Sequence, residues 1–173
     1  MRNLFVFVVL TYVLVSACTK DYETISTIED TATIAEGTYP NVAEELWVYF
    51  ARFEKEAAER GQTIDLNSLN LTAAIEELHP DDVAGVCNYN SRNPNHIGID
   101  QTFWNRAASR WREMVVFHEL GHCVLGRGHR EDNFDNNLCV SIMRSGTGTC
   151  RDAYQSSTRD YYLDELFDET IVP

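Results

Sequence analysis

The sequence predicts an α+β domain in which a small sheet of short strands is flanked along the chain by helices. Three observations support this: helical spacing of apolar residues after Asn41, short apolar stretches separated by turn residues between positions 66 and 100, and strong helical periodicity from about Ser109. With 173 residues and 44% hydrophobic content, the chain can build one domain with its own core. We therefore expect one folded domain over residues 39–173.

The first residues have the pattern of an export signal. Arg2 precedes an uncharged apolar run from Leu4 to Val15, which is too short for a spanning helix of roughly 20 residues. The ending Val15-Ser16-Ala17-Cys18 resembles a bacterial lipobox, in which the cysteine is lipidated. The resemblance implies a lipoprotein signal peptide at 1–17 and an exported, lipid-anchored protein of the bacterial cell envelope, at the outer membrane or cell surface. An ordinary cleaved signal peptide is the alternative.

The segment after Cys18 is predicted to be a tether. Residues 19–37 are rich in Thr, Asp and Glu and have no sustained apolar period. We assign residues 18–38 to the lipidated cysteine and a flexible tether, and we expect the folded unit to begin near Tyr39.

The first helix is predicted from about Asn41 to Gly61. Asn41 is a candidate N-cap, with Glu44 placed to complete a capping box, and Gly61 is a candidate end. The apolar residues at helical spacing are Val42, Leu46, Phe50, Phe53 and Ala57.

The next part of the chain predicts a small sheet. Three apolar stretches are separated by Pro- and Asn-rich turn segments, and they cover Leu71–Leu78, Val83–Tyr89 and His96–Asp100. We interpret them as three short strands.

Two more helices are predicted after the strands. One covers about Ser109 to Leu125, and the other Arg159 to Phe167, with Ser157 or Thr158 as its cap. Trp104 and Trp111 are expected in the core, while His79 and His96 are expected to be ordinary turn or strand-edge residues.

Four cysteines remain after Cys18, an even number that favours two disulfides in an exported chain. Three pairings of Cys87, Cys123, Cys139 and Cys150 are possible. Cys139 and Cys150 bracket a short loop, so their pairing is geometrically easy and would leave Cys87 for Cys123. A cysteine zinc site is disfavoured because no CxxC spacing occurs.

The chain is acidic, with 27 acidic and 14 basic residues and a net charge of -13. Because it has no Lys/Arg cluster, a nucleic-acid partner is disfavoured. We expect the protein to be a monomer. The acidity favours solubility and the repulsion of anionic substrates, although a bound dication reverses the field locally.

The segment His118-Glu119-Leu120-Gly121-His122 lies in the strongly periodic helix. Residues four apart share one helical face, so both imidazoles can reach one zinc ion, with Glu119 beside it. The glycines at 126 and 128 allow the chain to turn and bring His129 back as a third nitrogen ligand. Three protein ligands with a fourth position for water are typical of a catalytic zinc site. Asp132 and Glu165 are the alternative third ligands.

These residues resemble the metzincin clan of zinc peptidases, whose pattern is HExxHxxGxxH followed by a methionine turn. Here one extra residue separates His122 from Gly126, and Met143 lies 14 residues after His129. The resemblance implies a small domain in which the zinc helix backs a twisted sheet, with Met143 forming an apolar floor beneath the metal. Glu165 is a candidate because the gluzincins take their third ligand from a downstream helical glutamate.

The site predicts a zinc-dependent peptidase acting on protein or peptide. Zinc activates water and stabilises the oxyanion, and Glu119 accepts the proton of the attacking water as general base. Tyr154, Tyr161 and Tyr162 are candidate second donors. A substrate strand is expected to add to an exposed sheet edge, at Val83–Tyr89 or His96–Asp100.

Two other functions stay open. One is a zinc hydrolase of another amide or ester, and the other is a non-catalytic lipoprotein that binds a partner and uses zinc for structure. Glu119 favours catalysis, because a structural site has no need of a carboxylate beside an open position.

Overall fold

The computed structural model describes residues 38–80, 82–89, 95–146 and 148–171. The expected signal peptide at 1–17, Cys18 and the tether up to residue 37 lie outside these residues. Among the described helices, none has the length and apolarity needed to cross a membrane.

The first helix begins later than its sequence suggested. A short 3-10 helix, η1 (Glu44–Leu46), leads into α1 (Trp47–Glu59), and no side chain caps either element. The predicted capping box at Asn41 is wrong because the backbone there pairs with the sheet: the carbonyl of Asn41 accepts from the amide of Ala73 at 3.1 Å. Gly61 does end the helix, with φ +76°.

The three predicted strands are confirmed in the described chain as β1 (Thr72–Glu76), β2 (Gly85–Asn88) and β3 (His96–Asp100). Their order is β1-β3-β2, with β1 parallel and β2 antiparallel to β3. The strand His96–Asp100 is therefore central and is excluded as an open edge. The edge toward the predicted site is β2, in the segment Val83–Tyr89.

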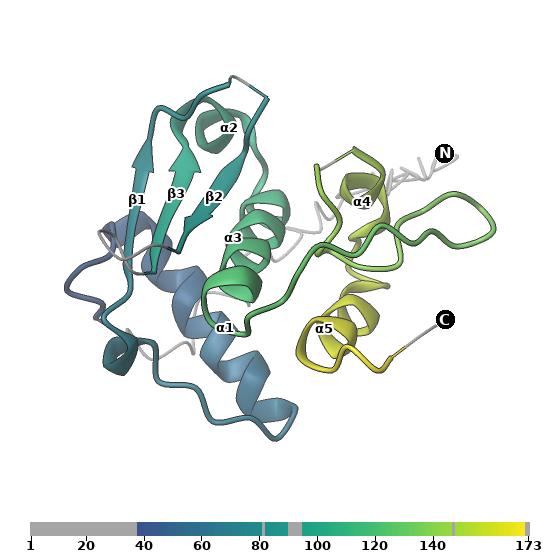
Figure 1. The fold of residues 1–173 in the computed structure, drawn as a ribbon, viewed down its shortest axis with the longest axis horizontal. Coiled ribbons are helices and arrows are strands. Elements are labelled where there is room, and N and C mark those ends of the chain that lie inside the picture. The colour runs from purple at the N-terminus through teal and green to yellow at the C-terminus, as the bar shows by residue number, and fades with distance from the viewer. Residues whose placement is uncertain (1–37, 81, 90–94, 147, 172–173) are drawn as a thin grey trace, which may run out of the picture. The chain divides into compact units, whose positions relative to one another are not determined.

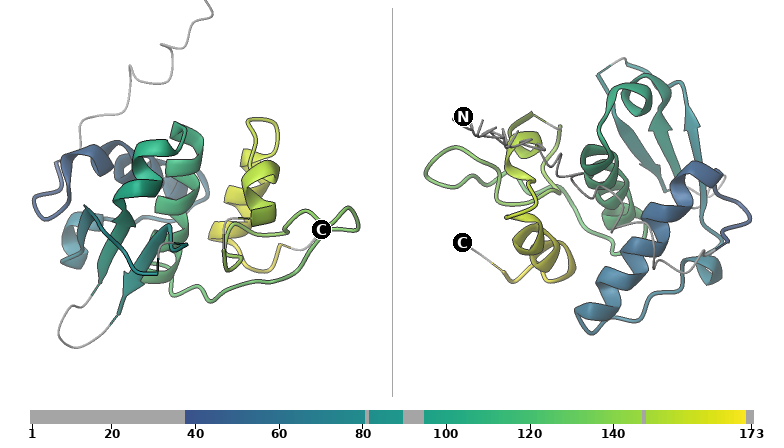
Figure 2. Two further views of the ribbon diagram at one scale, coloured as in Figure 1. Left: turned by 90° about the horizontal axis from the view of Figure 1, so that it is seen from above. Right: turned by 180° about the vertical axis from the view of Figure 1, so that it is seen from behind.

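The helix α3 (Ser109–Cys123) lies at the centre of the fold. It packs against β2, β3 and α1, and Figures 1 and 2 show it between the sheet on one side and α4 and α5 on the other. Val116, Phe117 and Leu120 of α3 are fully buried. This element was predicted from periodicity, and its position fixes the surroundings of the His-Glu motif.

Several short elements were not predicted. They are η2 (Leu66–Leu69), α2 (Gln101–Arg106) and α4 (Gly148–Ala153). The side chain of Asp100 caps α2 by accepting from the amide of Phe103 at 2.6 Å. Trp104 of α2 is buried as expected, whereas Trp111 is only partly buried.

The last helix is confirmed as α5 (Arg159–Phe167). Thr158 stands at its N-cap position, but its hydroxyl donates to the carbonyl of Ala153 at 2.6 Å and makes no cap bond to the helix. Leu163 and Leu166 of α5 are fully buried. This helix packs into the core close to the segment that follows α3.

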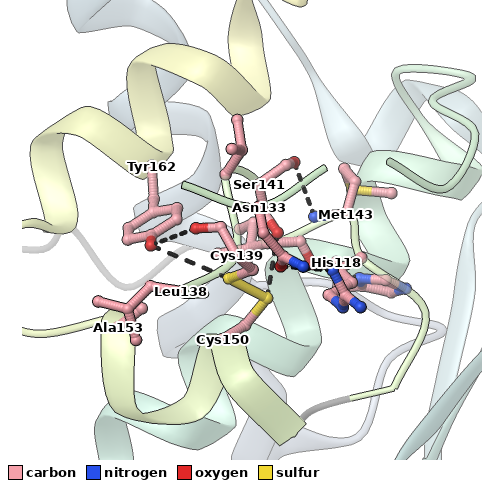
Figure 3. Close-up of a disulfide and its surroundings, with 12 residues drawn as sticks. His118, Asn133, Leu138, Cys139, Ser141, Met143, Cys150, Ala153 and Tyr162 are labelled. Atoms are coloured by element: carbon pink, nitrogen blue, oxygen red, sulfur yellow. Dashed lines mark hydrogen bonds between the residues drawn. A yellow bond between two sulfur atoms is a disulfide. The ribbon is translucent and has the colours of Figure 1, made fainter. Parts of the chain in front are cut away.

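Both favoured cysteine pairs form disulfides within the described residues. Cys87 of β2 is joined to Cys123 at the end of α3, and Cys139 is joined to Cys150 of α4. Figure 3 shows the second disulfide next to Ser141 and Met143. The first bridge links the sheet edge to the central helix, and the second links the loop after α3 to α4.

Candidate metal centre

The last two turns of α3 carry His118, Glu119 and His122. The helix ends at Cys123, and Gly126 has φ +67°, a conformation that favours glycine. The amide of Arg127 then donates to the carbonyl of Gly121 at 2.9 Å. The turn after α3 thus accommodates the extra residue between His122 and Gly126. Beyond this turn the chain runs back toward α3.

His129 lies after this turn and joins the two helical histidines. Nε2 of His122 lies 3.0 Å from Nε2 of His118 and 3.2 Å from Nε2 of His129. The ligand nitrogens of the three rings all lie within 4.8 Å of one another, and this is the group that could hold a metal ion among the described residues. For comparison, nitrogens at about 2.0–2.1 Å from a tetrahedral zinc ion are about 3.3 Å apart.

Backbone carbonyls fix the tautomers of two of these rings. Nδ1 of His118 lies 2.6 Å from the carbonyl oxygen of Ile142, and Nδ1 of His122 lies 2.7 Å from that of Arg127. A carbonyl oxygen only accepts hydrogen bonds, so both Nδ1 atoms carry the proton and both neutral rings present an unprotonated Nε2. Two lone pairs therefore face each other at 3.0 Å, which is unfavourable unless a cation lies between them.

The electrostatics of the two rings favour the neutral form. Burial lowers the pKa of His118 to about 4, and the hydrogen bond to Ile142 only partly opposes this. The pKa of His122 is also lowered, mainly by burial. Both rings are thus ready to act as metal ligands at neutral pH, without first losing a proton.

Glu119 lies beside the cluster and against the sheet edge. Its side chain is buried, and a Cβ added to Gly85 of β2 would lie 2.8 Å from its Oε1. Burial raises the pKa of Glu119 to about 8, opposed by a hydrogen bond from the backbone of Cys87. A dication at the histidines would lower that pKa again. The carboxyl therefore lies in an environment that suits a group exchanging a proton near neutral pH.

Met143 packs on the helix α3 that carries His118 and His122. It is fully buried, and a Cβ added to Gly121 would lie 2.5 Å from its Sδ. Figure 3 shows Met143 close to His118. The thioether thus packs against α3 at Gly121. Its expected role as an apolar floor beneath a metal stays a prediction.

The two alternative third ligands make other contacts. The carboxylate of Asp132 pairs with Arg130 at 3.1 Å. The carboxylate of Glu165 is fully buried and pairs with Arg127 at 2.6 Å and Arg130 at 2.9 Å. It also accepts a hydrogen bond from Ser141. His129 is therefore the residue that completes the cluster.

The three candidate tyrosine donors are also engaged elsewhere. The hydroxyl of Tyr154 donates to Glu113, that of Tyr161 to the carbonyl of Val140, and that of Tyr162 to the carbonyl of Cys139. None of them lines the cleft described next. The expectation that one of them supplies a second donor is wrong for this conformation.

The histidines and Glu119 line a cleft of about 440 Å³. One wall is the segment from Asp82 to Cys87, which includes edge strand β2, and the other side includes Ile142, Arg144 and Cys150. His96 lies away from it, with its ring between Thr72 and Glu76.

The fold and the site define an α+β protein with a histidine triad that could hold a metal ion at the base of a cleft. Comparisons with models of protein families, with curated proteins and with solved structures find no match. The arrangement of side chains is therefore the basis for a functional proposal.

Proposed function

We propose that this protein is a zinc-dependent peptidase of metzincin type. The observation that carries the proposal is the pair of unprotonated Nε2 atoms facing each other at 3.0 Å, with a third ring beside them and a buried carboxyl next in sequence to the first. Imidazole nitrogens suit zinc, and three of them leave a coordination position open. His118, His122 and His129 would hold the ion.

The chain's own residues supply the remaining chemistry. A zinc ion held there provides Lewis acidity, which makes water nucleophilic near neutral pH and polarises a carbonyl. The carboxylate of Glu119 accepts the proton of the attacking water and returns it to the leaving nitrogen. The backbone of β2 is an open sheet edge in the cleft wall, and it can pair with an extended peptide whatever its sequence.

The peptidase test separates metal binding from catalysis. We expect the purified protein to contain about one zinc ion per chain by mass spectrometry of metals, and to cleave quenched fluorescent peptides. Glu119→Gln should retain the ion but lose at least a hundredfold in kcat/KM, since it removes the proton acceptor while keeping shape. Activity that survives this substitution, or survives a chelator that strips the zinc, would contradict the mechanism.

The same assay distinguishes the two other functions. A hydrolase of another amide or ester would bind zinc and leave the peptides intact while cleaving activated esters in a Glu119-dependent way. A binding lipoprotein with structural zinc would hydrolyse neither, and Glu119→Gln would change neither its metal content nor its stability.

We also propose that the chain is a lipoprotein of the bacterial cell envelope, anchored through Cys18. Support comes from the Arg2 to Cys18 pattern and from two disulfides in the described residues, which form in oxidising compartments. Expression of the full chain in bacteria fed a tagged fatty acid should label it, and Cys18→Ala should abolish the label. Labelling that is unchanged in the variant would exclude the anchor.

A further inference from the structure

A second cavity adjoins the metal cleft. Its volume is about 330 Å³, and it shares Asp82, Val83, Ala84 and Met114 with the cleft. The rest of its wall comes from α2, the first turn of α3 and α4, through residues that include Phe103, Arg106, Trp111 and Arg151. We call it the arginine pocket. A chain lying along β2 would pass from one cavity into the other.

Two cations in this pocket have no acidic partner in the part of the chain that the structure describes. Arg106 and Arg151 are exposed, and within 38–80, 82–89, 95–146 and 148–171 the side chain of neither makes a hydrogen bond or ion pair. Several half-buried arginines elsewhere, such as Arg127 and Arg159, do pair with carboxylates. The pocket thus holds two guanidinium groups that are available to bind an anion.

Arg151 is held in a defined position. Its guanidinium carbon lies 3.4 Å from the centroid of the Trp111 ring. Stacking on an indole uses the face of the guanidinium and leaves its N–H edge free to bind a carboxylate through two parallel hydrogen bonds. Because the indole already restricts the Arg151 side chain, this side chain loses less conformational entropy on binding a ligand than a freely exposed arginine would.

Two acidic residues also line the pocket. Asp100 is buried, and its oxygens accept from the amides of Phe103 at 2.6 Å and Leu78 at 3.3 Å, so it is committed to the backbone. Asp82 is exposed and belongs to the wall that the two cavities share. The end of the pocket formed by α2 and α4 is therefore the cationic end.

We propose that the arginine pocket binds a carboxylate of the peptide substrate, so that this acidic protein selects acidic peptides. The inference rests on the proposed peptidase function. Met114 and Trp111 precede His118 by four and seven residues, which is about 6 and 10 Å along α3. An extended peptide advances about 3.3 Å per residue, so the carboxylate belongs two or three residues from the scissile bond.

The test compares peptides that differ at one position. A set of quenched peptides with amidated C-termini carries Glu, Gln or Lys at each position up to four residues from the cleaved bond. We expect Glu two or three residues away to raise kcat/KM about tenfold over Gln, and Lys to lower it. A parallel set of free acids that end at those positions distinguishes a terminal carboxylate from a side-chain carboxylate. Equal rates for Glu, Gln and Lys, with no gain from a free terminus, would overturn the proposal.

Variants assign any preference to the pocket. Arg151→Glu and Arg106→Glu should each reduce the ratio of Glu to Gln rates about tenfold, and the double change should favour the Lys peptide. Arg151→Lys keeps the charge without the planar fork and should retain only part of the preference. Lys55→Glu on α1 is the matched control for net charge, since its side chain is exposed and lies outside both cavities. A preference that persists in the double variant would overturn the assignment.

A binding measurement keeps this test independent of hydrolysis. Labelled Glu and Gln peptides are titrated into the Glu119→Gln protein with its metal retained, and binding is followed by fluorescence anisotropy. The Glu peptide should bind about tenfold more tightly, and the Arg106→Glu, Arg151→Glu protein should lose this difference. If no peptide is cleaved but this difference is present, the peptidase proposal fails and the carboxylate site stands. If peptides are cleaved without such a difference, the pocket proposal fails alone.

Discussion

The carboxylate of Glu165 accepts a hydrogen bond from Nη2 of Arg127 at 2.6 Å, and the backbone carbonyl of this same Arg127 orients His122. Glu165 also binds Arg130, the residue after His129. Through Ser141 it reaches the segment whose next residue, Ile142, orients His118. One buried carboxylate on α5 is thus connected to the supports of all three histidines.

The first prediction concerns this carboxylate. Glu165→Gln keeps the volume but removes the buried counter-charge of Arg127 and Arg130, which are left with the exposed carboxylates of Glu169 and Asp132. We expect a loss of about 3–5 kcal/mol in the free energy of unfolding. Zinc affinity should fall about 10- to 100-fold, as is typical when a partner of a metal-binding histidine is removed. Denaturant titration and competition with a zinc-binding dye measure the two effects.

The matched control for Glu165 lies on the same helix. The carboxylate of Asp164 is 51% exposed and pairs with Arg60, so Asp164→Asn should cost less than about 1 kcal/mol and leave zinc affinity unchanged. A Glu165→Gln protein with normal zinc affinity would show that α5 has no part in holding the ligands.

The third ligand gives a second prediction. His129→Ala should weaken zinc binding more than Glu165→Gln does, because it removes a ligand and not only its support. Asp132→Asn, three residues away, changes an exposed ion pair with Arg130 and should leave zinc binding unchanged. Zinc affinity is measured by isothermal titration calorimetry. If Asp132→Asn weakens zinc binding more than His129→Ala does, Asp132 is the third ligand.

The packing of Met143 on α3 gives a third prediction. Gly121→Ala would place a Cβ 2.5 Å from Sδ of Met143 and 3.1 Å from Cδ1 of Leu166. We expect overpacking to lower the free energy of unfolding by about 1–3 kcal/mol. The higher helix propensity of Ala offsets up to about 1 kcal/mol of this loss. Gly128→Ala is the control, because no atom lies within 4 Å of its added Cβ, and it should be neutral or slightly stabilising. Thermal unfolding of the two variants, with and without zinc, measures the difference; equal stabilities would show that Met143 adjusts freely.

Buried tyrosines predict the behaviour at high pH. Burial is the main cause of the raised pKa of Tyr39, Tyr154 and Tyr162, and the last of these is raised to about 12. Above pH 10 the unfolded chain loses phenolic protons that the folded chain keeps, so the free energy of unfolding should fall between about pH 10 and 12. Each such tyrosine contributes up to about 1.4 kcal/mol per pH unit in this window.

Denaturant titrations at several pH values between 9 and 11.5 measure this slope. Tyr162→Phe should make the slope smaller by the share of one tyrosine, even though it also removes the hydrogen bond to the carbonyl of Cys139 at all pH values. A slope that is the same in wild type and variant would show that Tyr162 ionises alike in the folded and unfolded chain.

The longer helices and the strands bounded by turn residues could be predicted from the sequence, whereas the short helices and most long-range side-chain partners could not. The helix Ser109–Cys123 and the helix Arg159–Phe167 each carry enough turns for their apolar spacing to stand out. The six-residue helices α2 and α4 are too short for that. The capping box at Asn41 failed because tertiary pairing with Ala73 competed with a local bond.

The candidate site divides in the same way. His118, Glu119 and His122 share one helix, so their spacing alone brings them together. The position of His129 depends on the turn at Gly126. The sequence predicts such a turn, but it does not give the distance from His129 to the two helical histidines. The role of Glu165 could not be predicted, because its partners Arg127 and Arg130 lie far away in the chain. The sequence does show these two arginines on either side of His129, which indicates that a buried carboxylate could pair with them.

The bridge between Cys87 and Cys123 has a mechanical consequence. It joins β2, in one wall of the cleft, to the end of α3, which carries two of the histidines. The disulfide therefore limits how far β2 and α3 can separate. If the cleft widens to admit a folded polypeptide, the movement has to come from its other wall. There the loop that leads to Met143 is joined to α4 by the second disulfide. A cleft limited in this way would favour extended peptides over folded polypeptides.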